Sequence, residues 1–342
     1  MNDMNIAITD IYGNLYKNDR LFDLNACSIG ENLLLPGIEL KKKLEEKGHQ
    51  YHTLDVYKAN EVDVVVFQEI PRSWYTLTNF IDKLKYVLKF SARKDTLLQV
   101  VKRVPKENRI LLIMEPPVVA NRSYEKLFHK YFGKILTWND ELVDGKIYHK
   151  IFYPQPKPDL EYCKKWEEKK MFTMICGNKT SDHPDELYSQ RRKVIDYFEK
   201  TKHEFDLYGI GWGKESLKNY KGRIDKKLEV LSGYKFAFCY ENQGSASGYI
   251  TEKIFDCFFA NCVPIYWGAP NVTTYIPKNT FIDRRDFQTE DELMKYLYAI
   301  DEKEYAQYLR NIKEYLNGDL YNKHFSVQAY VESMTKYILE GK

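Results

Sequence analysis

The segment from residue 234 to residue 267 constrains the fold of this 342-residue chain more than any other. Tyr234 to Tyr240 is a run of apolar and aromatic residues that predicts a buried strand, and Cys262 to Trp267 predicts a second one. Between them lie a loop rich in glycine and serine and a segment of helical periodicity that starts near Tyr249. This order of strand, loop, helix and strand predicts an α/β unit with a parallel sheet.

The predicted helix has one apolar face and one polar face. Its first turn carries unpaired N–H groups and a partial positive charge, and Lys253 adds a full charge, which suits a diphosphate. Glu252 can accept hydrogen bonds from sugar or ribose hydroxyls, and Tyr249 offers a ring and a hydroxyl. An ordinary buried crossover explains the apolar face but not these three side chains together. Because ligands of such sheets bind at the carboxyl ends of strands, the segment predicts a sugar-nucleotide site.

The first half of the chain alternates predicted strands and helices, as parallel α/β folds do. Ile110 to Met114 is a predicted buried strand, and Glu115 follows it directly before two prolines. Proline prevents helix continuation, so we expect Glu115 at the carboxyl end of this strand, facing a cleft. Glu69, at the end of the apolar run from residue 62 to residue 67, is the alternative acidic residue at a strand end.

A proline-rich stretch at residues 153–159 predicts a stiff linker between two domains. We therefore expect an N-terminal Rossmann-like domain over residues 1–155 and a C-terminal one over residues 156–342. Amphipathic helices are predicted over residues 289–317 and 324–340, where they close the second domain. The length suits two domains, each with its own core.

Composition and charge narrow the class of protein. The net charge of +3 is too small for a dedicated nucleic-acid binder. The sequence has no apolar run long enough to span a membrane and does not start like a signal peptide, which predicts a cytoplasmic protein with reduced cysteines. The basic stretch at residues 83–103 reads as a solvated helix face, with peripheral contact to the inner face of the membrane as the alternative.

The sequence predicts no obligatory metal. It contains no Asp-X-Asp pair and no HExxH motif, and a cation beside a diphosphate needs carboxylates to hold it. We therefore expect any effect of divalent metal to be stimulatory at most. The positive charge for a departing diphosphate then has to come from side chains.

Residues 240–268, YENQGSASGYITEKIFDCFFANCVPIYWG, closely resemble the signature of the α-1,3/1,4-fucosyltransferases of glycosyltransferase family 10. The resemblance is strong over about thirty residues and weaker over most of residues 110–290. It implies two Rossmann-like domains that face each other across a cleft, the GT-B arrangement, with the acceptor bound by the first and the donor by the second. It also implies GDP-β-L-fucose as donor and an inverting transfer that forms an α-1,3 or α-1,4 bond.

The resemblance extends to further residues. The MEPP segment resembles the ESP-like segment of the family, which implies that Glu115 is the catalytic base, with Glu69 as its rival. The family places an arginine at the start of a helix to bind the leaving group, and Arg191 fits this pattern better than Arg192. Asn242 matches the family's asparagine and could bind the nucleotide or position the loop. Lys253 would share the diphosphate with Arg191, while Tyr249 and Glu252 would bind the fucose or the ribose.

Two other functions stay open on the sequence. The same fold could use a different GDP-sugar, or the chain could be a glycan-binding protein that has lost activity. The implied acceptor is a glycan that contains GlcNAc or glucose, such as a lipopolysaccharide or another surface oligosaccharide, and neither the acceptor nor the linkage can be read from the residues.

Overall fold

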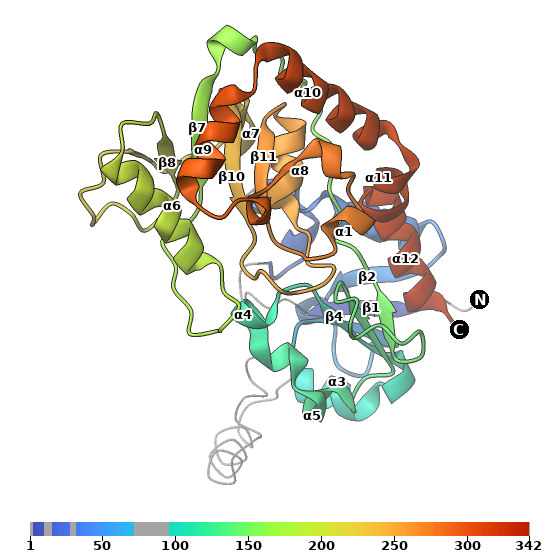
Figure 1. Cartoon of the computed structure of the whole chain (residues 1–342). Helices are drawn as coiled ribbons and strands as arrows, with labels where there is room; N and C mark the ends of the chain where they lie inside the picture. Colours follow the sequence, from blue (N-terminus) through green and yellow to red (C-terminus); the bar gives the residue numbers. More distant parts are fainter. Residues whose placement is uncertain (1–2, 10–15, 28–31, 72–95, 342) are drawn as a thin grey trace. The chain divides into compact units, whose positions relative to one another are not determined.

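The computed structural model describes residues 3–9, 16–27, 32–71 and 96–341 of the chain. Its contacts divide the chain into two compact units (Figure 1). The first unit consists of Met1–Cys27, Leu33–Phe152 and Val327–Lys342, and the second of Ser28–Asn32 and Tyr153–Ser326. Most of the basic stretch at residues 83–103 lies outside the described residues.

The first unit is built on a parallel sheet of six described strands. Its strand order is β2-β1-β3-β4-β5-β6, and each neighbouring pair is parallel. The strands are β1 (Asn5–Thr9), β2 (Gln50–Thr53), β3 (Val64–Gln68), β4 (Arg109–Ile113), β5 (Lys134–Thr137) and β6 (Tyr148–Lys150). The described helices are α1 (Leu35–Glu45), α3 (Thr96–Arg103), α4 (Pro117–Ala120), α5 (Lys126–His129) and α12 (Val327–Leu339). The parallel α/β order predicted from the sequence is confirmed.

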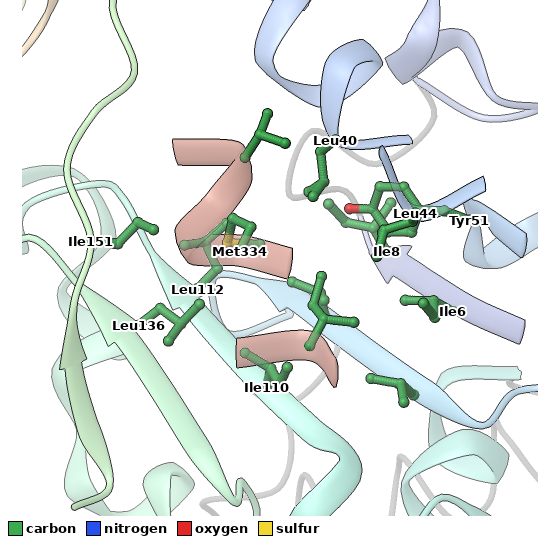
Figure 2. Close-up of a cluster of buried hydrophobic side chains, with 14 residues drawn as sticks. Ile6, Ile8, Leu40, Leu44, Tyr51, Ile110, Leu112, Leu136, Ile151 and Met334 are labelled. Carbon is green, nitrogen blue, oxygen red and sulfur yellow. The ribbon is translucent and has the colours of Figure 1, made fainter. Parts of the chain in front are cut away.

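The four inner strands of this sheet, β1, β3, β4 and β5, are buried on both faces, which explains why they read as largely apolar runs. Along β1, Ile6 and Ile8 point into one core cluster and Ala7 into the other. The first cluster joins the sheet to α1 and α12 through Leu40, Leu44 and Met334. Figure 2 shows these side chains around β1 and β4.

Helix α12 corrects the predicted domain boundary. The sequence-based assignment of residues 327–342 to the second domain is wrong, because α12 packs against α1 in the first unit. Val331, Met334 and Ile338 lie on one side of the helix at helical spacing and are buried in the first core cluster. Amphipathic periodicity identifies the helix and its apolar face, but it does not say which sheet that face covers.

The second unit has the same architecture. Its six described strands are parallel, in the order β12-β11-β10-β7-β8-β9. They are β7 (Lys170–Ile175), β8 (Asp206–Tyr208), β9 (Tyr220–Gly222), β10 (Tyr234–Tyr240), β11 (Val263–Trp267) and β12 (Ile282–Asp283). The helices are α6 (Tyr188–Lys200), α7 (Lys227–Ser232), α8 (Glu252–Phe259), α9 (Glu290–Ala299), α10 (Glu302–Asn317) and α11 (Asp319–His324).

The order of the strands in this sheet marks where a ligand can bind. The chain leaves β7 toward β8 and β9 on one side and returns to β10, β11 and β12 on the other. The carboxyl ends of β7 and β10 therefore lie at a topological switch point, the place where open α/β sheets bind ligands. The loops that follow these strands meet there, because Glu186 and Gln243 form an antiparallel bridge.

Candidate donor-binding site

Arg191 lies at the carboxyl end of β10. Its side chain extends from the first turns of α6, and only 6% of the residue is exposed. Nη2 donates hydrogen bonds to the carbonyl oxygen of Tyr240 at 2.7 Å and to Oδ1 of Asn242 at 3.0 Å. Among the described residues no acidic side chain forms an ion pair with Arg191. Its guanidinium therefore brings a net positive charge to this point of the sheet.

Arg192 has different surroundings. Its guanidinium forms ion pairs with Asp196 at 2.8 Å and Glu215 at 2.6 Å, and 42% of the side chain is exposed. Consecutive helix residues point about 100° apart, so only one of the two arginines can reach β10. The structure brings Arg191, and not Arg192, to the carboxyl end of β10.

Tyr249 is placed differently from the expectation. Helix α8 begins at Glu252, with Thr251 as its N-cap residue, so Tyr249 precedes the helix and does not share its polar face. Only 1% of Tyr249 is exposed, and its hydroxyl accepts a hydrogen bond from Nδ2 of Asn242 at 3.3 Å. Its ring lies edge-on to that of Tyr153 at 6.0 Å between centroids. The buried tyrosine thus fixes Asn242 from one side while Arg191 fixes it from the other.

Lys253 lies in the first turn of α8, and 22% of its side chain is exposed. Nζ is 3.2 Å from Oε2 of Glu241 and 3.3 Å from Oε1 of Glu252. It also donates a hydrogen bond to Oγ1 of Thr251 at 3.0 Å. Burial lowers the pKa of Lys253, but the charges of Glu241 and Glu252 outweigh this and raise it, so the ammonium stays protonated at neutral pH.

Glu241 is a residue of this site that we did not single out from the sequence. It follows β10 directly and is fully buried. Its carboxylate accepts hydrogen bonds from the backbone N–H and the hydroxyl of Thr251, at 2.9 and 2.7 Å. One acidic side chain therefore holds the N-cap residue of α8 and neutralises Lys253. A signal was present, because an acid that directly follows an apolar strand needs a partner when it is buried.

Gly268, which follows β11, lies so close to Glu241 that no side chain fits at this position. A Cβ atom at this position would overlap the hydroxyl of buried Tyr266 and Cγ of Glu241. The glycine in the YWG triplet is therefore required by the close approach of backbone to side chains. It keeps Glu241 against the end of the sheet.

Glu252 is the exposed acid of the group, with 48% of its side chain accessible. Partial burial opposes its ionisation, but the positive charges of Lys253 and Lys227 lower the pKa of Glu252 to about 2. Lys227 in α7 forms an ion pair with Asp256, one turn further along α8. Glu252 is therefore an ionised acceptor that is accessible to a ligand, as its proposed contact with sugar hydroxyls requires.

Arg191 and Lys253 reach the same short stretch of chain, because Arg191 bonds Tyr240 and Asn242 and Lys253 lies against Glu241 between them. The charge of Arg191 accordingly lowers the pKa of Lys253. Burial, Glu241 and Glu252 have the larger effects on this pKa. Two cations and the N-terminus of α8 thus converge at the carboxyl end of β10. Positive charge from two side chains and from helix N–H groups is the arrangement that binds a diphosphate.

The two candidate bases both lie in the first unit. Glu115 is half-buried and follows β4 by two residues, just before α4. Glu69 follows β3, the neighbouring strand, and is only 3% exposed. Both thus lie at the carboxyl edge of the first sheet, as predicted, but their accessibility differs strongly.

Within the described ranges, we find no cluster of three or more His, Cys, Asp or Glu side chains that could hold a metal ion. Over the same part of the chain, none of the helices combines the length and the apolar character that crossing a membrane requires.

The chain has two Rossmann-like units, as GT-B folds do, and the second unit gathers cations at the carboxyl end of its sheet. Residues 166–335 match the family model described as glycosyltransferase family 10 (fucosyltransferase) C-term. Through this segment the chain belongs to glycosyltransferase family 10. The predictions of two Rossmann-like domains and of this family are confirmed.

Curated relatives match part of the chain. The chain is 41% identical over 86 residues to the alpha-(1,3)-fucosyltransferase FucT of Helicobacter pylori, a match that covers 25% of this chain and 18% of that protein. It is 35% identical over 133 residues to GDP-fucose protein O-fucosyltransferase 3 of Xenopus tropicalis, which covers 38% of this chain and 26% of that protein. The matches thus span less than two thirds of either relative.

The fold is shared over nearly the whole chain. A crystal structure of an alpha1,3-fucosyltransferase with GDP-fucose superposes with a TM-score of 0.54 over 99% of this chain and 91% of that chain. The sequence identity in this superposition is 16%, so the likeness is one of fold.

Proposed function

We propose that this protein transfers L-fucose from GDP-β-L-fucose to a hydroxyl of a glycan that contains GlcNAc or glucose. The proposed product is an α-1,3 fucoside, with α-1,4 as the alternative linkage. One observation carries the proposal: Arg191 and Lys253 converge at the carboxyl end of β10 within a family 10 fucosyltransferase domain. The solved neighbour in complex with GDP-fucose supports the choice of donor.

In the proposed reaction the acceptor oxygen attacks the anomeric carbon of fucose from the face opposite the diphosphate. The bond from this carbon to the phosphate oxygen breaks, the configuration inverts, and GDP leaves with the electron pair. Glu115 takes the proton of the acceptor hydroxyl. Arg191 donates its planar fork to the diphosphate and Lys253 contributes a point charge, so the negative charge of the leaving group is stabilised as it develops.

The remaining residues bind or position the donor. Glu252 is ionised and half-exposed, and we assign it to the hydroxyls of fucose or ribose. Asn242 holds the guanidinium of Arg191 in place and presents its amide to the nucleotide. Tyr249 is buried, so we assign it to fixing Asn242 and the loop, in place of the sugar contact expected from the sequence.

The direct test measures acceptor-dependent GDP release with purified protein. A panel of nucleotide sugars identifies the donor, and an acceptor array with GDP-fucose identifies the acceptor and, after product analysis, the linkage. Lys253→Ala should lower the rate roughly a hundredfold or more, because a cation at the leaving group is lost. The matched control is Lys226→Ala. Lys226 is the N-cap residue of α7, and 76% of its side chain is exposed.

Three results would contradict the proposal in different ways. Full activity of Lys253→Ala would contradict the assignment of Lys253 to the diphosphate site. Turnover with another GDP-sugar, and none with GDP-fucose, replaces the donor but keeps the reaction class. Binding of GDP with no turnover of any donor supports an inactive glycan-binding protein.

The acceptor array should include peptides as well as glycans. The Xenopus relative is named as a protein O-fucosyltransferase, whereas the Helicobacter relative is named as an alpha-(1,3)-fucosyltransferase. We favour a lipopolysaccharide or another surface oligosaccharide, assembled in the cytoplasm or at the inner face of the membrane. Fucosylation of a peptide without any glycan product would contradict this choice.

We further propose that transfer needs no divalent metal, because the sequence lacks the carboxylate pair that would hold one beside the diphosphate. Activity in excess EDTA should stay within about twofold of the untreated rate, since Arg191 and Lys253 supply the charge. Loss of activity in EDTA that Mg²⁺ or Mn²⁺ restores would contradict this.

A further inference from the structure

Glu69 is a buried acid that the proposed reaction does not use. It follows β3 and lies beside the carboxyl end of β4, the strand that leads to Glu115. At 3% exposure its carboxyl group is poorly placed to meet a substrate hydroxyl. A buried carboxyl group is unfavourable unless it has hydrogen-bond partners, so its contacts indicate its task.

Its partners are the backbone of the segment that carries Glu115. Oε1 of Glu69 accepts hydrogen bonds from the N–H of Met114 at 2.6 Å and from the N–H of Glu115 at 2.8 Å. One oxygen therefore receives two consecutive N–H groups at the point where the chain leaves the sheet. These groups have no strand partner there, because β4 ends at Ile113.

Other contacts fix both ends of this arrangement. The hydroxyl of Tyr124 donates to the carbonyl oxygen of Glu115 at 2.8 Å. The backbone N–H of Glu69 donates to Leu112 at 3.0 Å, and that of Ile70 donates to Oγ of Ser123 at 3.0 Å. The backbone of Glu115 is thus held at its N–H by Glu69 and at its carbonyl by Tyr124.

The backbone of Glu69 itself is in an uncommon conformation, with φ of 62°. A left-handed conformation at a residue other than glycine is unfavourable and persists where the surroundings require it. Burial raises the pKa of Glu69 to about 7, with the charge of Glu115 adding to it, while the hydrogen bonds from the N–H groups of Glu115 and Met114 oppose the rise. The two carboxyl groups are therefore electrostatically coupled as well as joined through the backbone.

We propose that Glu69 is a positioning residue for the transfer: its carboxyl group holds the backbone of Met114 and Glu115 so that the Glu115 carboxylate stays oriented to accept the acceptor proton. This inference rests on the proposed function, in which Glu115 is the base. On the sequence alone, Glu69 and Glu115 are alternatives for the catalytic base. The proposal makes Glu115 the base and Glu69 the residue that positions it.

The test compares Glu69→Ala, which removes the acceptor oxygen, with Glu69→Gln, which keeps an amide oxygen at the same place. Glu107→Ala is the control, since Glu107 is an exposed acid near the start of β4. The first readout, which needs no activity, is amide hydrogen exchange of a peptide that covers residues 110–116. Exchange should be about tenfold faster in Glu69→Ala than in the wild type and close to wild type in Glu69→Gln and the control.

The second readout is steady-state kinetics with GDP-fucose and the acceptor identified above. Glu69→Ala should lower kcat about tenfold or more and leave the KM for GDP-fucose within about twofold, because a misplaced base slows the chemical step. Glu69→Gln should restore most of kcat. A general loss of structure would instead change KM as well.

Each outcome decides the inference. Unchanged exchange or unchanged kcat in Glu69→Ala overturns it, and so does a Glu69→Gln variant as slow as Glu69→Ala, which would show that the charge matters and not the hydrogen bonds. Wild-type kcat in Glu115→Gln also overturns it, because Glu115 would then not be the catalytic base. If the wild type transfers no fucose to any acceptor, the proposed function fails instead, and the exchange result alone decides whether Glu69 holds this turn.

Discussion

At the scale of single residues, the candidate donor site is a balance of charges around Lys253. Its ammonium has Glu241 as a buried partner and Glu252 as a partly exposed one, whereas nearby Arg191 has none among the described acids. Without a ligand, the two cations Arg191 and Lys253 are therefore matched by the two anions Glu241 and Glu252. Lys227 and Asp256, close by, neutralise each other. We interpret Glu241 as the counter-ion of Lys253 in the free protein, a task the diphosphate takes over in part.

Glu241→Gln tests this interpretation. Without GDP, the free energy of unfolding should fall by about 3 kcal/mol, because a buried ion pair loses one partner. With saturating GDP the loss should be smaller, since the diphosphate provides negative charge beside Lys253. Urea unfolding with and without GDP measures both values, with Glu229→Gln as the exposed control. An equal loss under both conditions would contradict the interpretation.

Glu69 makes a separate prediction about pH. Its pKa is raised by burial from 4.5 to about 7, so folding favours the protonated form. The stability that this group contributes is fully present below pH 4.5 and is lost as the pH rises through 7. A shift of this size corresponds to about 3 kcal/mol.

Glu69→Gln removes this titration. Its free energy of unfolding should therefore rise relative to the wild type by about 3 kcal/mol between pH 4.5 and pH 8. Chemical denaturation at a series of pH values measures the difference. A difference between variant and wild type that is independent of pH would show that Glu69 is ionised at its ordinary pKa.

At the scale of elements, two helices bring the candidate donor-binding residues to the end of β10. Helix α6 carries Arg191 on its buried side, where Val194 and Phe198 pack into the core. Helix α8 begins at Glu252, so Lys253 lies in its first turn beside unpaired N–H groups. Each helix thus fixes its cation through the burial of its own apolar face.

Arg191→Lys and Arg192→Ala distinguish the two arginines of α6. Lysine keeps the charge of Arg191 but loses the fork that bonds Tyr240 and Asn242, so the affinity for GDP should fall about tenfold or more. Arg192→Ala should leave it within about twofold, because its ion pairs are exposed and contribute little. Isothermal titration with GDP decides between them. The reverse ranking would assign the diphosphate to Arg192.

At the scale of the whole molecule, the chain forms two α/β units and returns to the first one at its end. Helix α12 buries Val331, Met334 and Ile338 against the first sheet and α1, although 174 residues of the second unit, Tyr153–Ser326, precede it. The first unit is therefore incomplete until the last helix has been made. The stability of the first unit therefore depends on residues 327–342.

Deletion of residues 327–342 should thus destabilise the first unit and leave the second largely intact. Three large apolar side chains lose their burial, which corresponds to roughly 5 kcal/mol. Calorimetry should show an early or absent transition for the first unit and a second transition close to that of the full chain. Two unchanged transitions would contradict the assignment of α12 to the first unit.

The sequence by itself determined the parallel α/β architecture and most residues of the candidate donor site, although not Glu241. Continuous apolar runs identify strands buried on both faces, and the neighbours of β10 along the chain, from Asn242 to Lys253, stay neighbours in space. These are local properties, because strand and helix periodicities and short loops depend on residues close in the chain. Asn242, Glu252 and Lys253 could therefore be found without a structure.

Only the tertiary structure decided which residues meet across the chain. Packing of α6 selects Arg191 over Arg192, and the fold pairs Glu241 with Lys253 across twelve positions. The carboxyl group of Glu69 reaches the backbone of Glu115 only because β3 and β4 are adjacent strands. Periodicity says which face of a helix or strand is buried. It does not say which other element this face packs against, and the partners of a buried charge depend on that element.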